Sequence, residues 1–542
     1  MTRFRTWPDV RAVVLVHLAC VAMAGYAGWF VVKHGSSGVP ICDEWHLLAE
    51  WTSENDTLRW AVKHHFEHRY PLGKMVWISI LQATGWNFRA PMFLTVGLLA
   101  ASAILLLWTA RLRRGHTRLC DVMIPVLLLH LGHQFNYTMG YQVGFALFVY
   151  AVAGWQWCAA KFESTQRNRW LWLAGMYGSV ALGSGGFGLV FTVPWVLWCL
   201  WMGWKHRRWM WSFAALAVAY TMWVVLTMPP NPAQVQQSRE PLVLLQGTWA
   251  YASTALGDWH VAYPMQTKLV ELLSLGLYLL VLVSIRKWTP STVALVLGSV
   301  VLVLGLGLAT TLVRGVGYGS RFVSISAVCF ASMWVLISTA RAWPKWVDLL
   351  AVVFALGLLW INHGAAIRYG YQLRKACEEF RTDAVNGLSA EVLQGKYQGT
   401  MMVVVGGLAD DIRTLKPNPS LKLEQVGFLP PYTAQPVDGI ATPFDYGCPA
   451  DRIDKPPILS FPVPPPGTIA LRLTLTTTQA PGWQRVVFSD GTWTYETFTP
   501  WVPTPGLQLL VPVPAGSRPI TMKPLTHIAG FRVEAAEWLV GQ

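Results

Sequence analysis

The chain has 542 residues, of which 53% are hydrophobic and only 13% are charged. That length excludes a single small domain, and that composition places the chain among membrane proteins. The net charge of +14 would suit a nucleic-acid partner, but the Lys and Arg residues gather in short clusters between apolar segments. Clusters of this kind indicate membrane topology instead.

The first apolar segment runs from Val13 to Val32 and has about 20 residues, enough to cross a bilayer core of roughly 30 Å. Its apolar run is longer than that of a signal peptide. We therefore expect a retained anchor. Arg3, Arg5 and Arg11 precede it and predict a cytoplasmic N-terminus.

The apolar segments that follow predict a helical membrane bundle over residues 1–362. They are Met92 to Ala110, Val122 to Leu131, Val143 to Ala160, Trp170 to Leu182, Leu189 to Trp204, Trp209 to Met228, Lys268 to Ile285, Thr292 to Val313, Phe322 to Ala340 and Val347 to Ile361. Basic residues at the inner loops agree with about eleven alternating crossings. The segment Met75 to Trp86 is short for a crossing, so we expect it to rest against the bundle.

The composition changes from His363 onward. A helical stretch from Gln372 to Val385 and an apolar strand from Met401 to Val405 predict an α/β connector over residues 363–455. Beyond Pro456, segments of strand length stand between turn residues: IALRLTLT, QRVVFSDG, LQLLVPV and GFRVEAAEWLV. They predict an antiparallel β-sandwich over residues 456–542, on the extracytoplasmic side.

The cysteines give no sign of a metal site. Of the eight, none belongs to a CxxC motif or to a Cys/His set with metal-ligand spacing. Cys377 and Cys448 both fall in the predicted extracytoplasmic part, where a disulfide between them is one alternative because that compartment is oxidising.

The stretch from Cys42 to Pro71, in a first extracytoplasmic loop over residues 34–91, concentrates charge. Its acids and histidines are Asp43, Glu44, Glu50, Glu54, Asp56, Glu67, His46, His64, His65 and His68. Apolar residues recur at helical spacing in two groups, Trp45 with Leu48 and then Leu58, Val62 and Phe66. This spacing predicts two short amphipathic helices on a membrane face, with Asp56 as the N-cap of the second.

Three acids in this stretch are candidates for a general base: Asp43, Glu44 and Glu67. A partly desolvated carboxylate near the bilayer suits the deprotonation of a hydroxyl group. For the adjacent pair Asp43 and Glu44, the alternative is a role in capping a helix. The choice among the three acids stays open.

Other polar residues at the outer ends of the spans are candidates for binding. Glu67, His68 and Arg69 place an acid, a titratable donor and a phosphate-binding guanidinium in succession, or else form a solvated turn. Arg321 opens a span after GVGYGS, where it holds a phosphate or snorkels to the head groups. The GSGGFG link follows no strand, so it indicates close helix packing and not a nucleotide loop.

These features together resemble the GT-C class of integral membrane glycosyltransferases, in a bacterial branch of that class. The strings that carry the resemblance are DEW at Asp43 to Trp45, FEHR at Phe66 to Arg69, FNYTMGYQ ending at Gln142, GYGSRF at Gly317 to Phe322 and GFLPP at Gly427 to Pro431. The resemblance covers the membrane region well and the β-rich region poorly.

The resemblance implies that a sugar moves, with inversion, from a polyprenyl-phosphate carrier to an extracytoplasmic glycan, lipid or protein acceptor at the bacterial inner membrane. It implies Asp43 as catalytic base and Arg321 as a cation for the donor phosphate. The residues that would place donor, acceptor or an optional divalent metal are Glu44, Glu67, His68, Arg69 and Gln142. The alternatives are a transporter or flippase of lipid-linked sugars and a non-catalytic polysaccharide-assembly protein; sparse ionisable residues at mid-span depth argue against alternating access.

Overall fold

A computed structural model of the chain describes residues 7–36, 38–54, 56–65, 69–228, 240–257, 264–285, 287–314, 322–340, 343–397, 408–415, 421, 423, 425–426, 432–437, 444–445, 458–477, 485–498, 507–524 and 531–541. The chain divides into two compact units. The first unit comprises Met1–Ser37 and Asp56–Gly370, and the second comprises Gly38–Asn55 and Tyr371–Gln542.

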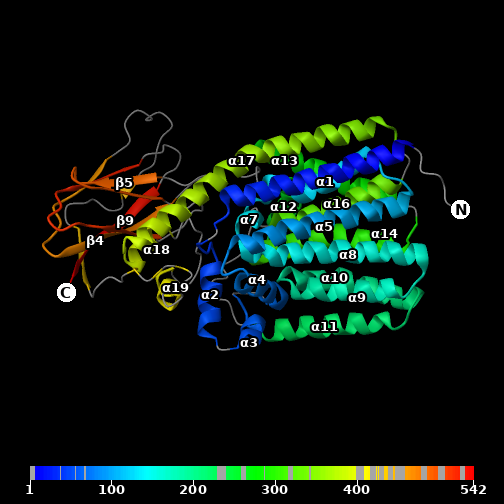
Figure 1. Cartoon of the computed structure of the whole chain (residues 1–542), viewed down its shortest axis with the longest axis horizontal. Helices are drawn as coiled ribbons and strands as arrows, with labels where there is room; N and C mark the ends of the chain where they lie inside the picture. Colours follow the sequence, from blue (N-terminus) through cyan, green and yellow to red (C-terminus); the bar gives the residue numbers. More distant parts are fainter. Residues whose placement is uncertain are drawn as a thin grey trace. The chain divides into compact units, whose positions relative to one another are not determined.

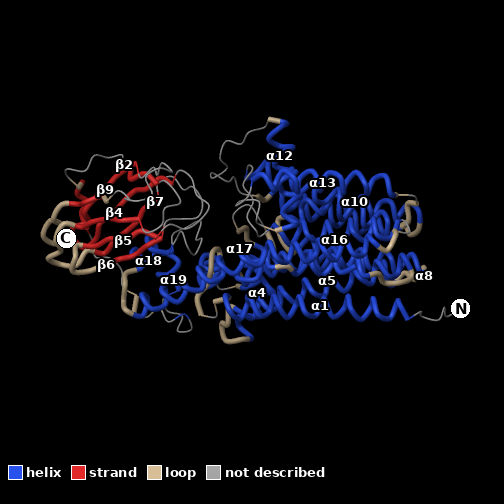
Figure 2. The backbone as a smooth tube through the Cα atoms, turned by 90° about the horizontal axis from the view of Figure 1, so that it is seen from above, coloured by secondary structure: helices blue, strands red, loops and turns tan. Residues whose placement is uncertain are grey.

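The first unit is a bundle of helices in which α1, α5 and α8 run side by side (Figures 1 and 2). Its longer helices are α1 (Trp7–His34), α4 (Pro71–Ala83), α5 (Arg89–Arg114), α8 (Val143–Thr165), α9 (Arg169–Gly183), α10 (Phe187–Lys205), α11 (Met210–Leu226), α12 (Pro241–Ser253), α13 (Pro264–Ser284), α14 (Pro290–Val296), α15 (Leu302–Arg314) and α16 (Val323–Ala340). The long helix α17 (Trp346–Val385) contains the boundary between the two units.

Six helices are long and apolar enough to cross a membrane, counted over the described residues: Val10–His34, Arg89–Arg114, Gly140–Thr165, Phe187–Lys205, Pro290–Leu312 and Trp346–Val385. Shorter apolar helices cover Met210–Leu226, Leu272–Val283 and Val323–Thr339. The chain therefore has the helices of a polytopic membrane protein, as the composition predicted. The number of about eleven crossings stays a prediction.

Two predicted elements differ in the structure. The expected crossing from Val122 to Leu131 is no single spanning helix, because its α-helix α6 (Met123–Leu129) has seven residues and rises only about 10 Å. The chain is helical on both sides of the change in composition at His363, since α17 continues through it as one helix of 40 residues, and the domain boundary there stays a prediction. No proline interrupts the chain between the two predicted segments, so the change in composition alone does not end the helix.

The segment after α6 is buried within the first unit. The polar string HQFNYTMGYQ, which the alternation of the spans predicts on the outer side of the membrane, falls in the short helices η2 (Leu131–His133), α7 (Gln134–Thr138) and η3 (Gly140–Gln142). Its polar groups find partners inside the bundle: Asn136 Nδ2 donates to Ser324 Oγ at 2.5 Å, and His133 Nδ1 lies 2.9 Å from the same oxygen. Irregular backbone is tolerated at membrane depth when protein surrounds it.

Helices α8, α9 and α10 pack closely because aromatic rings of neighbouring helices lie against glycines, which have no side chain. A Cβ added at Gly154 of α8 would overlap the ring of Tyr177 on α9, and one added at Gly178 would overlap the indole of Trp195 on α10. Trp195 is buried, so the ring has little room to move. Small residues that receive large ones are a common way of packing helices in lipid.

We expect Gly178→Ala to destabilise the first unit by about 1 to 3 kcal/mol, because the added methyl group overpacks the contact with Trp195. The matched control is Gly97→Ala on α5, where an added Cβ meets nothing within 4 Å. The midpoint of thermal unfolding in detergent measures both. Equal midpoints for the two variants would contradict the glycine contact.

One span of the bundle contains a π-helical turn. Residues Leu297–Val301 form this turn between α14 and α15, and Ser299 Oγ donates to the carbonyl of Leu295 at 2.5 Å. A Cβ at Gly298 would overlap the amide of Gln156 on α8. Helix α14 packs against α8 and α16, whereas α15 packs mainly against α12 and α10. The turn therefore separates two halves of the span that face different neighbours.

The second unit contains two antiparallel sheets and three short helices, α2 (Glu44–Ser53), α18 (Ala390–Tyr397) and α19 (Leu408–Leu415). One sheet has the order β1 (Tyr432–Pro436), β9 (Phe531–Gly541), β4 (Thr468–Thr477) and β7 (Leu507–Pro512), with β2 (Phe444–Asp445) also paired to β9. The other has the order β3 (Leu459–Phe461), β8 (Ile520–Pro524), β5 (Arg485–Ser489) and β6 (Thr494–Phe498).

Both sheets contribute to one hydrophobic core. Leu473 and Trp538 enter it from one sheet, Phe488 and Met522 from the other, and Val392 of α18 joins them. The prediction of a strand-rich C-terminal region is confirmed, and its four segments correspond to β4, β5, β7 and β9. The predicted strand Met401 to Val405 and the Cys377 to Cys448 disulfide depend on residues outside the described part of the chain.

Candidate active site

The two short helices predicted for the charged stretch are present, each in its own unit. In α2, Trp45 and Leu48 are buried inside the protein, whereas the prediction placed them on a membrane face, and the Trp45 ring packs edge-on against Phe380 with centroids 5.4 Å apart. In α3 (Thr57–Val62), Asp56 is the predicted N-cap, since its Oδ1 accepts from the Leu58 amide at 2.8 Å.

Of the apolar residues predicted to face the membrane from α3, Leu58 and Val62 are exposed, while Trp60 is fully buried. Beside Trp60 lies Lys74 of α4, a buried lysine whose Nζ donates to the carbonyls of Trp60 and Lys63 at 3.2 Å each. Its ammonium group also lies 5.0 Å from the centroid of the Trp60 ring. Lys74 thus turns the Trp60 side of α3 inward by capping the C-terminal end of that helix.

The adjacent acids Asp43 and Glu44 have different surroundings. Glu44 is fully buried, and its Oε2 accepts a hydrogen bond from the backbone N–H of Ile41 at 2.8 Å. Asp43 is half-buried at the N-cap position of α2, but its side chain makes no capping hydrogen bond. The capping alternative therefore applies to Glu44, whose carboxylate holds the turn that leads into α2.

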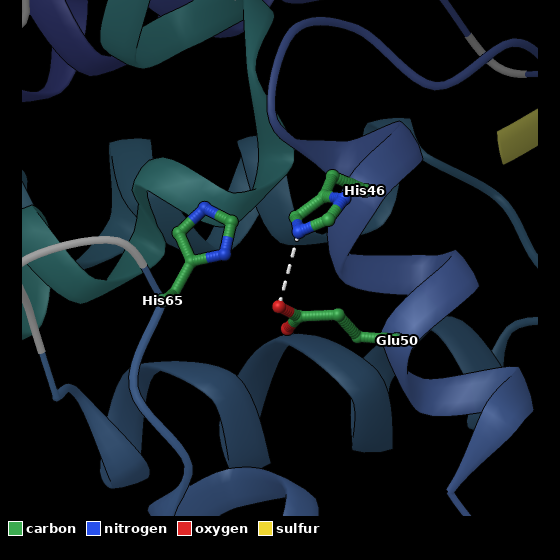
Figure 3. A group of neighbouring side chains, drawn as sticks. All are labelled: His46, Glu50 and His65. Carbon is green, nitrogen blue, oxygen red and sulfur yellow. Dashed lines mark ion pairs between the residues drawn. The ribbon is translucent and has the colours of Figure 1, made fainter. Parts of the chain in front are cut away.

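A histidine on α2 lies between two carboxylates. His46 Nε2 is 3.1 Å from Glu50 Oε1, one turn further along the helix (Figure 3). His46 Nδ1 is 3.6 Å from Asp411 Oδ1 of α19, and Asp411 is buried. The carboxylates of Asp411 and Glu50 raise the pKa of His46 to about 10. The imidazole is therefore a cation at neutral pH, held between an acid of its own helix and an acid of a second helix.

Burial raises the pKa of Asp411, and the nearby His46 opposes that rise. Asp411 thus depends on His46 to stay ionised inside the protein.

The sequence reasoning missed Asp411 because it lies more than 360 residues from His46. A signal was present in the string LADDIRTL, where Leu408, Ile412 and Leu415 form the buried face of an amphipathic helix. Asp411 occupies a position on that buried face. An acid at an apolar position needs a counter-charge, so the helix itself predicts a basic partner.

The other predicted site residues are described in part. Arg69 precedes α4, and its guanidinium lies over the Trp223 ring of α11, 4.2 Å from the centroid. Gln142 is fully buried, and neither polar atom of its side chain has a hydrogen-bond partner in the described residues. Glu67, His68 and Arg321 lie outside the described part of the chain.

Gln142 lies where three chain segments approach closely. A Cβ added at Gly144, two residues further on, would come within 2.8 Å of the Ser184 carbonyl, and one added at Gly73 within 3.2 Å of the Gly144 Cα. Ser184 belongs to the GSGGFG link, so this link packs closely against helices, as its composition predicts. The buried Gln142 amide thus lies two residues from this close contact.

Comparison with known proteins adds little. No protein-family model matches the chain, and no curated protein matches it. Among solved structures it is similar to arabinosyltransferase EmbB from Mycobacterium smegmatis, with 12% sequence identity and a TM-score of 0.29. The match covers 100% of this chain and 65% of that one. A TM-score this low does not establish a shared fold.

Proposed function

We propose that this protein is a membrane glycosyltransferase of GT-C type. It moves a sugar from a polyprenyl-phosphate carrier to an acceptor hydroxyl outside the cytoplasm, with inversion at the anomeric carbon. The N-terminus is cytoplasmic, and the C-terminal strand-rich region is extracytoplasmic in the inner membrane of a bacterium. The donor needs no nucleotide because it arrives in the bilayer already activated.

The observation that carries the proposal is the placement of Asp43. This acid lies nine residues beyond the end of the apolar helix α1, is half-buried, and stands at the N-cap position of α2. A half-buried carboxylate close in sequence to a membrane span is a candidate general base. The resemblance of the DEW string to the GT-C class supports the same role.

The neighbouring residues take different parts in this proposal. Glu44 acts as a positioning residue, because its bond to the Ile41 amide fixes the turn that carries Asp43. His46, between Glu50 and Asp411, fixes α2 against α19.

In the proposed reaction, the acceptor oxygen attacks the anomeric carbon and forms the new glycosidic bond. The hydroxyl proton passes to Asp43. The bond from the anomeric carbon to the phosphate oxygen breaks, and the polyprenyl phosphate leaves with the electron pair. Arg321, Arg69, His68 and Gln142 are the proposed binding residues, and the cations among them offset the charge on the leaving phosphate. Glu67 is the alternative base.

The test is a transfer assay on the full chain in nanodiscs. A panel of radiolabelled polyprenyl-phosphate sugars is supplied with candidate acceptors, with a divalent cation in one series and a chelator in the other. Sugar released from the lipid and recovered on the acceptor supports the proposal. Translocation of intact lipid-linked sugar across the membrane without release would contradict it and indicate a flippase.

A further inference from the structure

A further set of side chains lies in the first unit, at the C-terminal part of α11. It consists of Arg69, Tyr220 and Trp223. The Arg69 guanidinium carbon lies 4.2 Å above the centroid of the Trp223 ring. The rings of Tyr220 and Trp223, one turn apart on α11, have centroids 5.9 Å apart. A cation and two aromatic rings are thus held together by one helix and the loop before α4.

Two hydrogen-bond donors of this group have no acceptor among the described residues. Arg69 Nε and the Tyr220 hydroxyl are shielded from solvent, and neither has a hydrogen-bond partner among the residues that the structure describes. Burial lowers the pKa of the Arg69 guanidinium, which means that the protein partly desolvates this charge. Buried donors without partners are rare in native proteins, and two beside each other indicate a missing acceptor.

The acceptor must be an anion that binds a guanidinium and a phenol together, as a phosphate oxygen does. The apolar surface of α11 indicates that this anion belongs to a membrane lipid. Leu216, Met222, Val225 and Leu226 are each more than half exposed, and Trp223 is 42% exposed. An apolar helix surface that ends at tryptophan, tyrosine and arginine is typical of the boundary between acyl chains and head groups.

We propose that Arg69, Tyr220 and Trp223 bind the phosphate of a membrane lipid whose hydrocarbon chain lies along α11. Arg69 and Tyr220 donate hydrogen bonds to phosphate oxygens, while Trp223 holds the guanidinium flat beneath them. The lipid is either a phospholipid or the polyprenyl phosphate itself. With a phospholipid the site is independent of the proposed transfer reaction, and with polyprenyl phosphate it is the place where the carrier docks.

Native mass spectrometry of the full chain, released from detergent micelles, counts the lipids bound. The probes are phosphatidylglycerol, polyprenyl monophosphate and, as a phosphate-free control, diacylglycerol. The variants are Arg69→Gln and Tyr220→Phe. The matched control is Arg169→Gln, because the Arg169 guanidinium lies over the Trp170 ring at 4.9 Å. This binding readout needs no turnover, so it succeeds or fails separately from the transfer assay.

We expect Arg69→Gln to weaken binding of the phosphate lipid about tenfold or more and Tyr220→Phe to weaken it by a smaller factor, because a bond to a charged group is lost in each. Arg169→Gln leaves binding unchanged. If polyprenyl phosphate displaces bound phosphatidylglycerol, the ligand is the carrier lipid. If phosphatidylglycerol stays bound, the ligand is a phospholipid. Equal binding by all variants, or equal binding of diacylglycerol, overturns the site. Tyr220→Phe keeps the ring, so a folding defect cannot explain its result.

Discussion

The Asp43→Asn substitution is expected to lower the rate of sugar transfer by a factor of about 10² to 10⁴, the usual contribution of a general base. Asparagine has nearly the same shape as aspartate but cannot accept the proton of the acceptor hydroxyl. The Asp43 side chain makes no capping hydrogen bond to α2. The loss should appear in turnover, and the thermal midpoint measured beside it separates a catalytic loss from a loss of folding.

The control for Asp43→Asn is Glu54→Gln, which removes an acid at the other end of the same helix. Glu54→Gln should transfer sugar at the normal rate. A second comparison is Glu44→Gln, which weakens the acceptor for the Ile41 amide and should lower both stability and turnover. Normal turnover by Asp43→Asn would exclude Asp43 as the base and leave Glu67 as the predicted alternative.

The His46→Phe substitution is expected to destabilise the second unit by about 2 to 4 kcal/mol, because it leaves a buried acid without its counter-charge. Phenylalanine keeps a ring of similar size, while Asp411 stays buried next to α2. Chemical unfolding followed by fluorescence of the second unit measures the change. The matched control is Glu378→Gln, which removes an exposed ion pair with Arg374 on α17 and should cost less than about 1 kcal/mol.

The pH dependence of unfolding tests the same interaction in the unchanged protein. The pKa of His46 rises to about 10 in the folded state, against about 6.5 in an unfolded chain. The stabilisation is therefore complete below about pH 6.5 and is lost as the pH rises toward 10. His46→Phe should flatten this part of the stability profile. A profile between these pH values that is the same in both proteins would show that His46 is not charged by its neighbours.

The features predicted correctly from the sequence are those set by local physics. Asp56 caps α3 because its carboxylate reaches amides only two and three residues away. The strands β4, β5, β7 and β9 follow from apolar patterns bounded by turn residues. Helix α1 covers the predicted first apolar segment, since a long apolar run carries the same signal in any context.

The features missed are those set by distant parts of the chain. The burial of HQFNYTMGYQ depends on Ser324, which accepts from Asn136 across nearly 190 residues. Likewise, the position of α3 depends on Lys74, whose charge is satisfied by two carbonyls and an aromatic ring. The identity of these partners cannot be predicted from the presence of a lysine in the sequence. The same holds for the site, where Asp43 and Glu44 look equivalent until the Ile41 amide distinguishes them.

The π-helical turn at Leu297–Val301 places a constraint on the length of the chain that its composition does not reveal. Removing one residue there would restore a regular α-helix through the span, and each residue turns such a helix by about 100°. The face of α15 that meets α12 and α10 would then rotate away from them, although α14 kept its place beside α8. Homologous proteins are therefore expected to vary in sequence at this turn but to keep its number of residues. Insertions and deletions should be absent from this span, although exchanges among apolar side chains are tolerated there.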